Sequence, residues 1–326
     1  MRKEVFIGLT YGDPAGIGPE VVLKTIANWK FKLKPIVIGF KEYLYRNKLY
    51  KAKNKNLTFY FPQKNKIKHS YIKLGKPTKY TGLHSYECLK AATFLARNNC
   101  PLVTGPVSKS TISSLGFTFS GQTDEMAKLL KINPNNVIML FVASDLRIAL
   151  FTRHISLSSV KSRVTKDKLK KFLILLNTEL KKYFFHNKKF KSYNPTIAVL
   201  GLNPHAGEDG MFGDEEIKVI KPVIKELNSS GLNIYGPFSP DAVLAGAGKN
   251  YLLKKKQEYD VYVSLYHDQA LPMFKAVAGM KGVNVTLGLP FLRVSVDHGT
   301  AFDIAGKNKA SNESMVSAIK LVEELL

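Results

Sequence analysis

The sequence predicts an α/β protein, and two observations support that prediction. Short apolar runs rich in Val, Ile and Leu recur along the chain, and their lengths are typical of buried strands. Longer stretches with apolar residues three and four positions apart lie between them, as expected for amphipathic helices. Strands that alternate with helices form a mostly parallel sheet covered by helices. At 326 residues the chain is long enough for two such α/β/α lobes, and we expect a cleft between them.

The expected strands are the apolar runs bounded by turn-forming residues; they comprise residues 5–10, 35–39, 101–104, 137–143, 148–152, 196–201, 261–265, 283–287 and 294–296. The expected helices comprise residues 19–28, 85–98, 124–130, 165–183, 214–228 and 311–326. The fourth helix is the most regular, because Leu169, Leu173, Leu176 and Leu180 lie on one face and lysines lie opposite. In the last helix, Ser311 and Glu313 provide a cap and an early acid.

The formal net charge of +24 raises the question of nucleic-acid binding. Only seven of the 49 basic residues are arginines, although base and phosphate recognition favours the planar fork of Arg. The lysines are spread along helix faces and loops, which favours a solvated surface over a nucleic-acid interface. A basic binding protein for nucleic acid or anionic surfaces therefore remains only an alternative, distinguished by a steep salt dependence.

Other features predict a cytoplasmic protein that neither crosses nor binds a membrane. No apolar run approaches eighteen residues, and the first strand begins too early to leave room for a signal peptide. Only Cys88 and Cys100 occur, which fits a reducing compartment and a fold without disulfides.

Two Gly-containing loops follow expected strands and start helices. Residues 12–20 resemble a dinucleotide fingerprint, but Val21 occupies the position that needs a third small residue. A tight turn and a role for Asp13 at the mouth of a site are equally compatible with this segment. Residues 105–109 lack the spacing of a phosphate-binding P-loop, although the following helix start could hold an anion near Lys109.

Three expected strands lead directly into a histidine, and this repetition is the strongest functional signal. The histidines are His154, His205 and His267. In open parallel sheets ligands bind beyond the carboxyl ends of the strands, so three imidazoles there could share one divalent cation. Three protein ligands and an open position are typical of a catalytic metal site. We therefore expect a metal-dependent enzyme.

Further candidates lie near the ends of later strands. Lys275, Asn284 and Arg293 offer donors for a phosphate or carboxylate. Asp268 and His298 are candidates for the general base, and the sequence does not rank them.

The residues discussed so far lie mostly in six longer segments: GDPAGIGPE (12–20), TGPVSK (104–109), LNPHAGEDGMFGDEE (202–216), GPFSPDAV (236–243), SLYHDQALPMFK (264–275) and GVNVTLGLPFLRVSVDHGTAFDIAGK (282–307). Together they resemble the 4-hydroxythreonine-4-phosphate dehydrogenase family of pyridoxal phosphate biosynthesis. The HGTAFDIAGK part is also similar to the cofactor loop of isocitrate and isopropylmalate dehydrogenases, whose two-lobed fold this family shares. The resemblance implies a first lobe of residues 1–125 plus about 290–326, and a second lobe of about 126–289 that carries the metal ligands and a dimer interface.

The resemblance also implies a reaction: oxidation of 4-phosphooxy-L-threonine by NAD or NADP to 2-amino-3-oxo-4-phosphooxybutanoate, which loses CO2 to give 3-amino-2-oxopropyl phosphate. The family's metal ligands fall on His154, His205 and His267, drawn from both subunits of a homodimer. The metal is zinc, magnesium, cobalt or manganese, because such sites accept several ions. Substrate contacts fall on Gln122, Thr123, Lys275, Asn284 and Arg293, and cofactor contacts on Gly299, Thr300 and Asp303.

One residue departs from the family pattern. The family commonly has His where this chain has Gln122. An amide can hydrogen-bond but cannot take up a proton as imidazole can, so we expect this position to orient the substrate. A metal-dependent hydrolase of a phosphorylated small molecule, using the same histidines to activate water, is the alternative enzyme.

Overall fold

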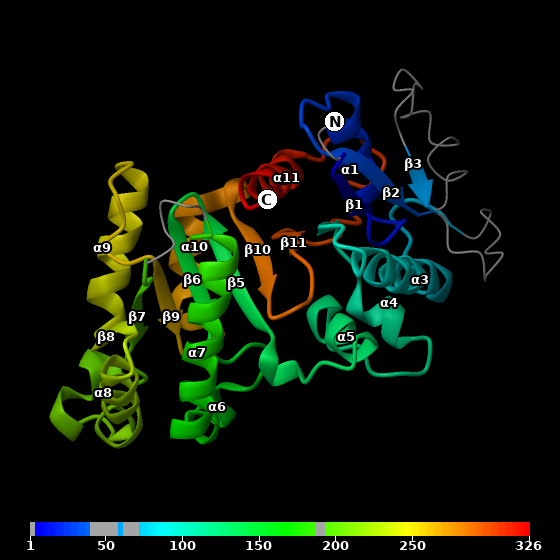
Figure 1. Cartoon of the computed structure of the whole chain (residues 1–326). Helices are drawn as coiled ribbons and strands as arrows, with labels where there is room; N and C mark the ends of the chain where they lie inside the picture. The colour runs from blue at the N-terminus through cyan, green and yellow to red at the C-terminus, as the bar shows by residue number, and fades with distance from the viewer. Residues whose placement is uncertain (1–3, 40–57, 61–71, 187–192) are drawn as a thin grey trace. The chain divides into compact units, whose positions relative to one another are not determined.

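The structure is a computed structural model that describes residues 4–39, 58–60, 72–186 and 193–326 (Figure 1). It confirms the α/β class. The chain divides into two compact units: unit 1 comprises Met1–Val137 and Leu289–Leu326, and unit 2 comprises Ile138–Gly288. The first division thus falls at Val137, whereas the predicted boundary is at residue 125. Within the described ranges, no helix is both long and apolar enough to span a bilayer.

The strands of unit 1 are all parallel and follow the order β3, β2, β1, β4, β11. They comprise β1 (Phe6–Thr10), β2 (Lys34–Ile38), β3 (Thr58–Tyr60), β4 (Leu102–Thr104) and β11 (Arg293–Val296). Their helices are α1 (Gly18–Ala27), α3 (Lys79–Ala96), α4 (Lys109–Ser113), α5 (Gln122–Leu129) and α11 (Glu313–Glu324), with a 3-10 turn η2 at Pro134–Asn136. Helices α1 and α11 pack on each other, whereas α3 packs on β1, β2, α4 and α5.

Unit 2 has the strand order β10, β5, β6, β9, β7, β8. These are β5 (Ile138–Ala143), β6 (Leu146–Leu150), β7 (Thr196–Leu200), β8 (Asn233–Phe238), β9 (Val261–Ser264) and β10 (Val283–Leu287). Strand β5 is antiparallel to both of its neighbours, β10 and β6. The pairs β6–β9, β9–β7 and β7–β8 are parallel, so the carboxyl ends of these four strands share one edge.

The helices of unit 2 are α6 (Leu157–Arg163), α7 (Lys166–Tyr183), α8 (Lys221–Ser229), α9 (Pro240–Leu252) and α10 (His267–Ala278), with short turns η4 (Pro204–Gly210), η5 (Glu216–Ile220) and η6 (Gly279–Lys281). Helices α9 and α10 pack on each other. Leu244, Leu271 and Phe274 from these helices form one apolar core with Ile148 and Tyr262 of the sheet. Helix α7 contacts α8, and its predicted apolar face is buried.

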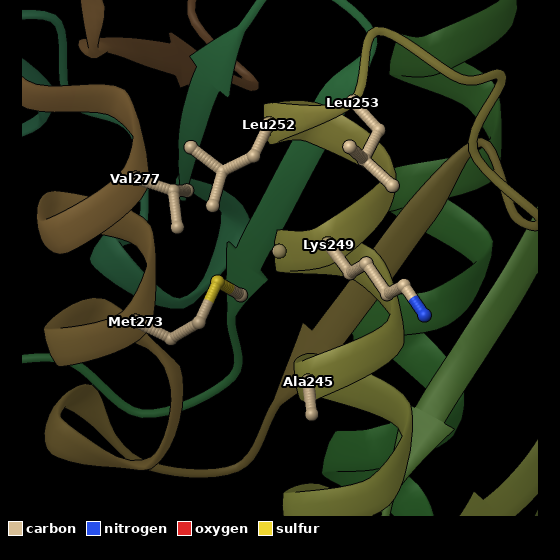
Figure 2. A pocket seen from close by; sticks show the side chains of 7 residues that line it. Ala245, Lys249, Leu252, Leu253, Met273 and Val277 are labelled. Carbon is tan, nitrogen blue, oxygen red and sulfur yellow. The ribbon is translucent and has the colours of Figure 1, made fainter.

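An apolar groove of about 460 Å³ runs between α9 and α10 (Figure 2). Leu252, Met273 and Val277 face one another in it, whereas the amine of Lys249 points away. Met273 and Val277 follow His267 by six and ten residues along α10, which is about 9 to 15 Å of helix. Apart from Lys249, the residues that line the groove are apolar or glycine, so it is poorly suited to an anionic substrate.

Helix α6 is tied to the segment after β7 by an ion pair. Lys161 Nζ lies 2.6 Å from Glu215 Oε1, and Asn203 Nδ2 donates to Glu215 Oε2 at 2.8 Å. The hydrogen bond from Lys161 is the largest cause that lowers the pKa of Glu215, to about 2.

Truncation of one α7 side chain tests the assigned core face. Leu173 is fully buried, whereas its neighbour Ile174 is 42% exposed. We expect Leu173→Ala to lower the free energy of unfolding by about 2–5 kcal/mol, because it removes apolar contacts and leaves a cavity. Ile174→Ala is the matched control, with an expected change below about 1 kcal/mol. Urea denaturation measures both, and equal effects would contradict the assigned face.

The Lys161–Glu215 pair predicts a pH dependence. Because the folded pKa of Glu215 is about 2 and its ordinary value is 4.5, its stabilisation is complete above pH 4.5 and is lost as the pH falls towards 2. Lys161 is 76% exposed, so solvent screens the pair and we expect its contribution to stability to be small. The stability difference between wild type and Glu215→Gln, measured by denaturant titration, should be constant from pH 5 to 7 and shrink below pH 4.5. A difference that grows on acidification would contradict this assignment.

Candidate functional site

The three predicted histidines follow three neighbouring parallel strands of unit 2. His154 follows β6, His267 follows β9 and His205 follows β7, and the strand order is β6, β9, β7. The end of β6 is fixed to that of β9, because the Thr152 hydroxyl donates to the Leu265 carbonyl at 2.6 Å. Pairing of the strands thus brings all three residues to the edge of the sheet where open α/β proteins bind ligands.

Two of these histidines lie close together. The ring centroids of His154 and His267 are 5.6 Å apart, with the ring planes inclined by 41°. Asp268 Oδ1 lies 2.6 Å from Nδ1 of His267. A carboxylate only accepts, so Nδ1 carries the proton and Nε2 keeps its lone pair for a ligand. A carboxylate on the other ring nitrogen is the usual partner of a metal-binding histidine.

His205 is placed apart from this pair by the loop that carries it. Its ring lies 6.4 Å from that of Phe212, and it contributes to the lowered pKa of Asp241, whose largest cause is the hydrogen bond from Ser239. Over the described ranges, no cluster of three or more His, Cys, Asp or Glu residues is arranged to hold a metal ion. One chain therefore brings together two of the three predicted ligands.

Unit 1 contributes a buried guanidinium. Arg293, at the start of β11, is 2% exposed and donates to the hydroxyls of Thr123 at 3.1 Å and Thr104 at 2.7 Å. Burial lowers the pKa of Arg293 to about 10, so it stays protonated at neutral pH. Thr104 ends β4 and Thr123 lies in the first turn of α5, so strand pairing and a helix start position this charge. The arrangement suits a phosphate or carboxylate.

The amide of Gln122 is oriented by the backbone beside this cluster. Its Nε2 donates to the Gly105 carbonyl at 3.0 Å. Its Oε1 is buried and makes no hydrogen bond within the described part of the chain. The amide oxygen is therefore available to accept from a bound molecule, which suits the predicted orienting role.

The predicted cofactor segment, which contains Gly299, Thr300 and Asp303, lies against the turn between β1 and α1. Ile17 N donates to the Thr300 carbonyl at 2.9 Å, and a side chain at Gly16 would come within 2.6 Å of the same oxygen. Gly299 and Asp303 are exposed next to Thr300. Nδ1 of His298 lies 3.0 Å from the Gly299 carbonyl and must donate to it, which leaves Nε2, itself buried, as the basic nitrogen.

Asp13 has a structural role. It is fully buried, and its carboxylate accepts from Ala15 N at 2.9 Å and from the hydroxyls of Thr81 and Thr111. Desolvation raises its pKa, and the three hydrogen bonds oppose that shift. These contacts fix the β1–α1 turn to α3 and α4, so the tight-turn interpretation of this loop is the one that the structure supports.

The predicted site residues are thus divided between the two units. Unit 1 holds Gln122, Thr123, Arg293, His298, Gly299, Thr300 and Asp303; unit 2 holds His154, His205, His267, Asp268, Lys275 and Asn284. Asn284 is buried on β10 opposite Phe141, and Lys275 is exposed on α10.

Sequence reasoning missed one residue at the strand edge. Gln269 accepts from Leu265 N at 2.7 Å and donates to the Gly201 carbonyl at 2.6 Å, so it connects the ends of β9 and β7. Its position two residues after His267, in a helix start rich in polar groups, is the only signal that the sequence contains for it.

Comparisons with known proteins identify the family of this chain. A family model described as "Pyridoxal phosphate biosynthetic protein PdxA" matches residues 20–322. The 4-hydroxythreonine-4-phosphate dehydrogenase of Sulfurihydrogenibium sp. is 35% identical over 97% of both chains. The D-threonate 4-phosphate dehydrogenase of Pectobacterium atrosepticum is 34% identical over 98% of both.

Solved structures give the same result. The 4-hydroxythreonine-4-phosphate dehydrogenase of Klebsiella pneumoniae superposes with a TM-score of 0.81 at 29% identity, covering 99% of this chain and 98% of that one. A beta-decarboxylating dehydrogenase from Thermococcus kodakarensis matches 98% of this chain and 83% of its own, with a TM-score of 0.50 at 14% identity, and supports the shared fold alone. The expected family and enzyme class, an oxidoreductase, are confirmed: this chain belongs to the PdxA family of pyridoxal phosphate biosynthetic proteins.

Proposed function

We propose that this chain oxidises 4-phosphooxy-L-threonine with NAD+ or NADP+ and a divalent cation. The product, 2-amino-3-oxo-4-phosphooxybutanoate, loses CO2 to give 3-amino-2-oxopropyl phosphate. The observation that carries this proposal is the pair of His154 and His267, 5.6 Å apart at the carboxyl edge of parallel strands, with Asp268 on the far nitrogen of His267. The substrate follows the names of relatives that align over nearly the whole chain.

The two histidines fit a divalent ion. Both follow parallel strands, and His267 keeps Nε2 available because Asp268 occupies Nδ1. His154 and His267 would hold the ion, and His205 would be the third ligand in a dimer in which two subunits complete each site. A bound divalent ion acts as a Lewis acid that eases deprotonation of a coordinated hydroxyl.

A homodimer is supported by apolar side chains next to two of the histidines. Leu157 is 71% exposed three residues after His154, and Met211 is 78% exposed in the loop that carries His205. Ile155 and Phe212 are exposed next to them. Large apolar side chains gathered on a surface mark association sites, and burial here would bring a second copy to the histidines.

Other residues have separate roles in the proposal. Arg293, held by Thr104 and Thr123, supplies a fixed positive charge for an anionic group of the substrate. Lys275 and Asn284 supply a further charge and an amide. Gln122 accepts from a substrate N–H or O–H through its oriented oxygen. Gly299, Thr300 and Asp303 would contact the nicotinamide cofactor.

Two groups could take the proton of the substrate hydroxyl. Nε2 of His298 is basic because Nδ1 donates to the Gly299 carbonyl. The Asp268 carboxylate already accepts from His267, so its proposed contribution is to orient that ring. We therefore favour His298 as the base. We also propose that the enzyme is cytoplasmic, where the buried thiols of Cys88 and Cys100 would remain free.

A second substrate is suggested by the Pectobacterium relative, which is named for D-threonate 4-phosphate. That molecule carries a hydroxyl where 4-phosphooxy-L-threonine carries an amine. The Gln122 oxygen could accept from either group, so this residue does not separate the two substrates.

A cofactor-reduction assay tests the reaction. We expect reduced nicotinamide absorbance to grow when the protein is mixed with NAD+ or NADP+, Co2+ and 4-phosphooxy-L-threonine, and to stop growing on addition of a chelator. D-threonate 4-phosphate is tested in the same assay, and faster cofactor reduction with it would reassign the substrate to that molecule. Release of inorganic phosphate without nicotinamide reduction would instead indicate the hydrolase.

Replacement of one histidine tests the metal ligands. His267→Ala should lower kcat/KM by about a thousandfold, because a bound cation contributes several kcal/mol of transition-state stabilisation. The metal content of the purified protein should fall with it. His186→Ala is the matched control, since His186 is exposed after α7 and its Nδ1 lies 3.0 Å from the carbonyl oxygen of Tyr183 in the same helix end. Wild-type turnover by a folded His267→Ala protein would refute the assignment.

A further inference from the structure

The loop that carries His205 has an unusual backbone. Five consecutive residues have positive φ: His205 (50°), Ala206 (53°), Gly207 (83°), Glu208 (40°) and Asp209 (49°). Each L-residue other than glycine costs about 1–2 kcal/mol in the left-handed helical region. Such a run persists only where the surrounding structure holds it in place. Contacts with residues outside the run must therefore provide that restraint.

One buried carboxylate provides several of these contacts. Glu216 is 1% exposed and begins η5, a single π-helical turn of the kind often found at functional sites. Its Oε1 accepts from Leu202 N at 2.7 Å and from Asn203 N at 2.8 Å. Its Oε2 accepts from Asn203 Nδ2 at 2.9 Å. Three donors just before His205 thus converge on one side chain.

The loop also closes around this carboxylate. A side chain at Gly207 would come within 2.8 Å of Glu216 Oε2, and one at Gly201 within 3.2 Å of Oε1. Both glycines are therefore needed to let the backbone approach the carboxylate. The left-handed turn is folded over Glu216, with contacts before and within the run of positive φ.

A second amide connects this arrangement to His267. Gln269 donates to the carbonyl of Gly201 and accepts from Leu265 N, at 2.6 and 2.7 Å. Leu265 precedes His267 by two residues, and Gly201 precedes His205 by four. Gly201, which directly precedes the residues bonded to Glu216, is therefore itself connected to the strand end that carries His267.

We propose that Glu216 is a positioning residue that holds His205 at the strand edge as a metal ligand. This inference rests on the proposed metal site. Glu216 itself binds no metal: its oxygens are occupied by the donors of Leu202 and Asn203. Its effect on metal affinity passes through the conformation of residues 203–209.

The conversion of Glu216 to Gln makes a sharp test, because the two side chains have the same shape. An amide that keeps its oxygen on Leu202 N and Asn203 N must turn its NH2 towards Asn203 Nδ2, so that donor faces donor. Asn203 cannot simply reverse its own amide, since the same Nδ2 donates to Glu215 at 2.8 Å. Glu216→Gln therefore loosens the start of the loop without leaving a cavity. Glu226→Gln is the matched control, because Glu226 is an exposed α8 residue paired with Lys170.

Two measurements are made on full-length protein that circular dichroism shows to be folded. The first is Co2+ titration, for which we expect Glu216→Gln to raise the Kd by about 10- to 100-fold, the usual effect of losing a group that orients a metal ligand. The second is hydrogen exchange without metal, in which a peptide covering residues 200–213 should exchange at least tenfold faster. Glu226→Gln should match wild type in both. A folded Glu216→Gln protein whose Co2+ Kd lies within twofold of wild type would overturn the inference.

Three further variants separate a failure of folding from a failure of the proposal, and the role of Glu216 from the metal site itself. If Glu216→Gln does not fold, Glu216→Asp retains the charge but is one methylene too short to reach both sets of donors. It should bind Co2+ more weakly than wild type, and an unchanged Kd would count against the proposal. His154→Ala and His267→Ala test the metal site itself. If they bind Co2+ as wild type does, the proposed function fails; if they lose binding while Glu216→Gln does not, only the role of Glu216 fails.

Discussion

Parallel pairing of β6, β9 and β7 is the constraint on which the candidate site depends. Parallel strands end at one edge, so three residues that are separated by 51 and 62 positions in the sequence reach the same side of unit 2. The turns that follow then determine what each histidine can do. Thr152 connects the turn after β6 to the turn after β9, and Gln269 connects the turn after β9 to the turn after β7. Both side chains hydrogen-bond to backbone groups at the ends of the strands, so they hold neighbouring turns together.

Much of the fold could be predicted because its elements are locally consistent. Helix α7 has an uninterrupted apolar stripe, and its predicted range differs from the observed one by a single residue at the start. The elements that escaped prediction contain residues that weaken local signals. Strand β8 includes Gly236 and Pro237, α9 is rich in small residues, and α10 has Pro272 in its interior. Packing of α9 and α10 on the apolar core overrides those weak preferences.

The site could be predicted only in part, for a related reason. A single sequence shows which histidines follow apolar runs. It also shows that arginine is rare in this chain, which draws attention to Arg293. The strand order that makes β6, β9 and β7 neighbours results from long-range pairing and has no local signature. The same holds for the left-handed turn at residues 205–209, whose four L-residues would not adopt positive φ by intrinsic preference. Glu216, eleven residues after His205, contacts the residues just before this turn, and no periodicity of the sequence reveals those contacts.

Gln122 shows how a departure from a family pattern can be interpreted from contacts. An imidazole at this position could change its protonation state near neutral pH. An amide cannot, and the Gly105 carbonyl further determines which end of the Gln122 amide faces away from the backbone. The chain therefore presents a constant acceptor next to Thr123, whose hydroxyl accepts from the guanidinium of Arg293. An acceptor next to a guanidinium is useful only to a molecule that carries both an anionic group and a nearby N–H or O–H. The proposed substrate, a phosphorylated hydroxy acid with an amine or a second hydroxyl, has both, so we infer that the replacement would keep its recognition while removing proton transfer from the position.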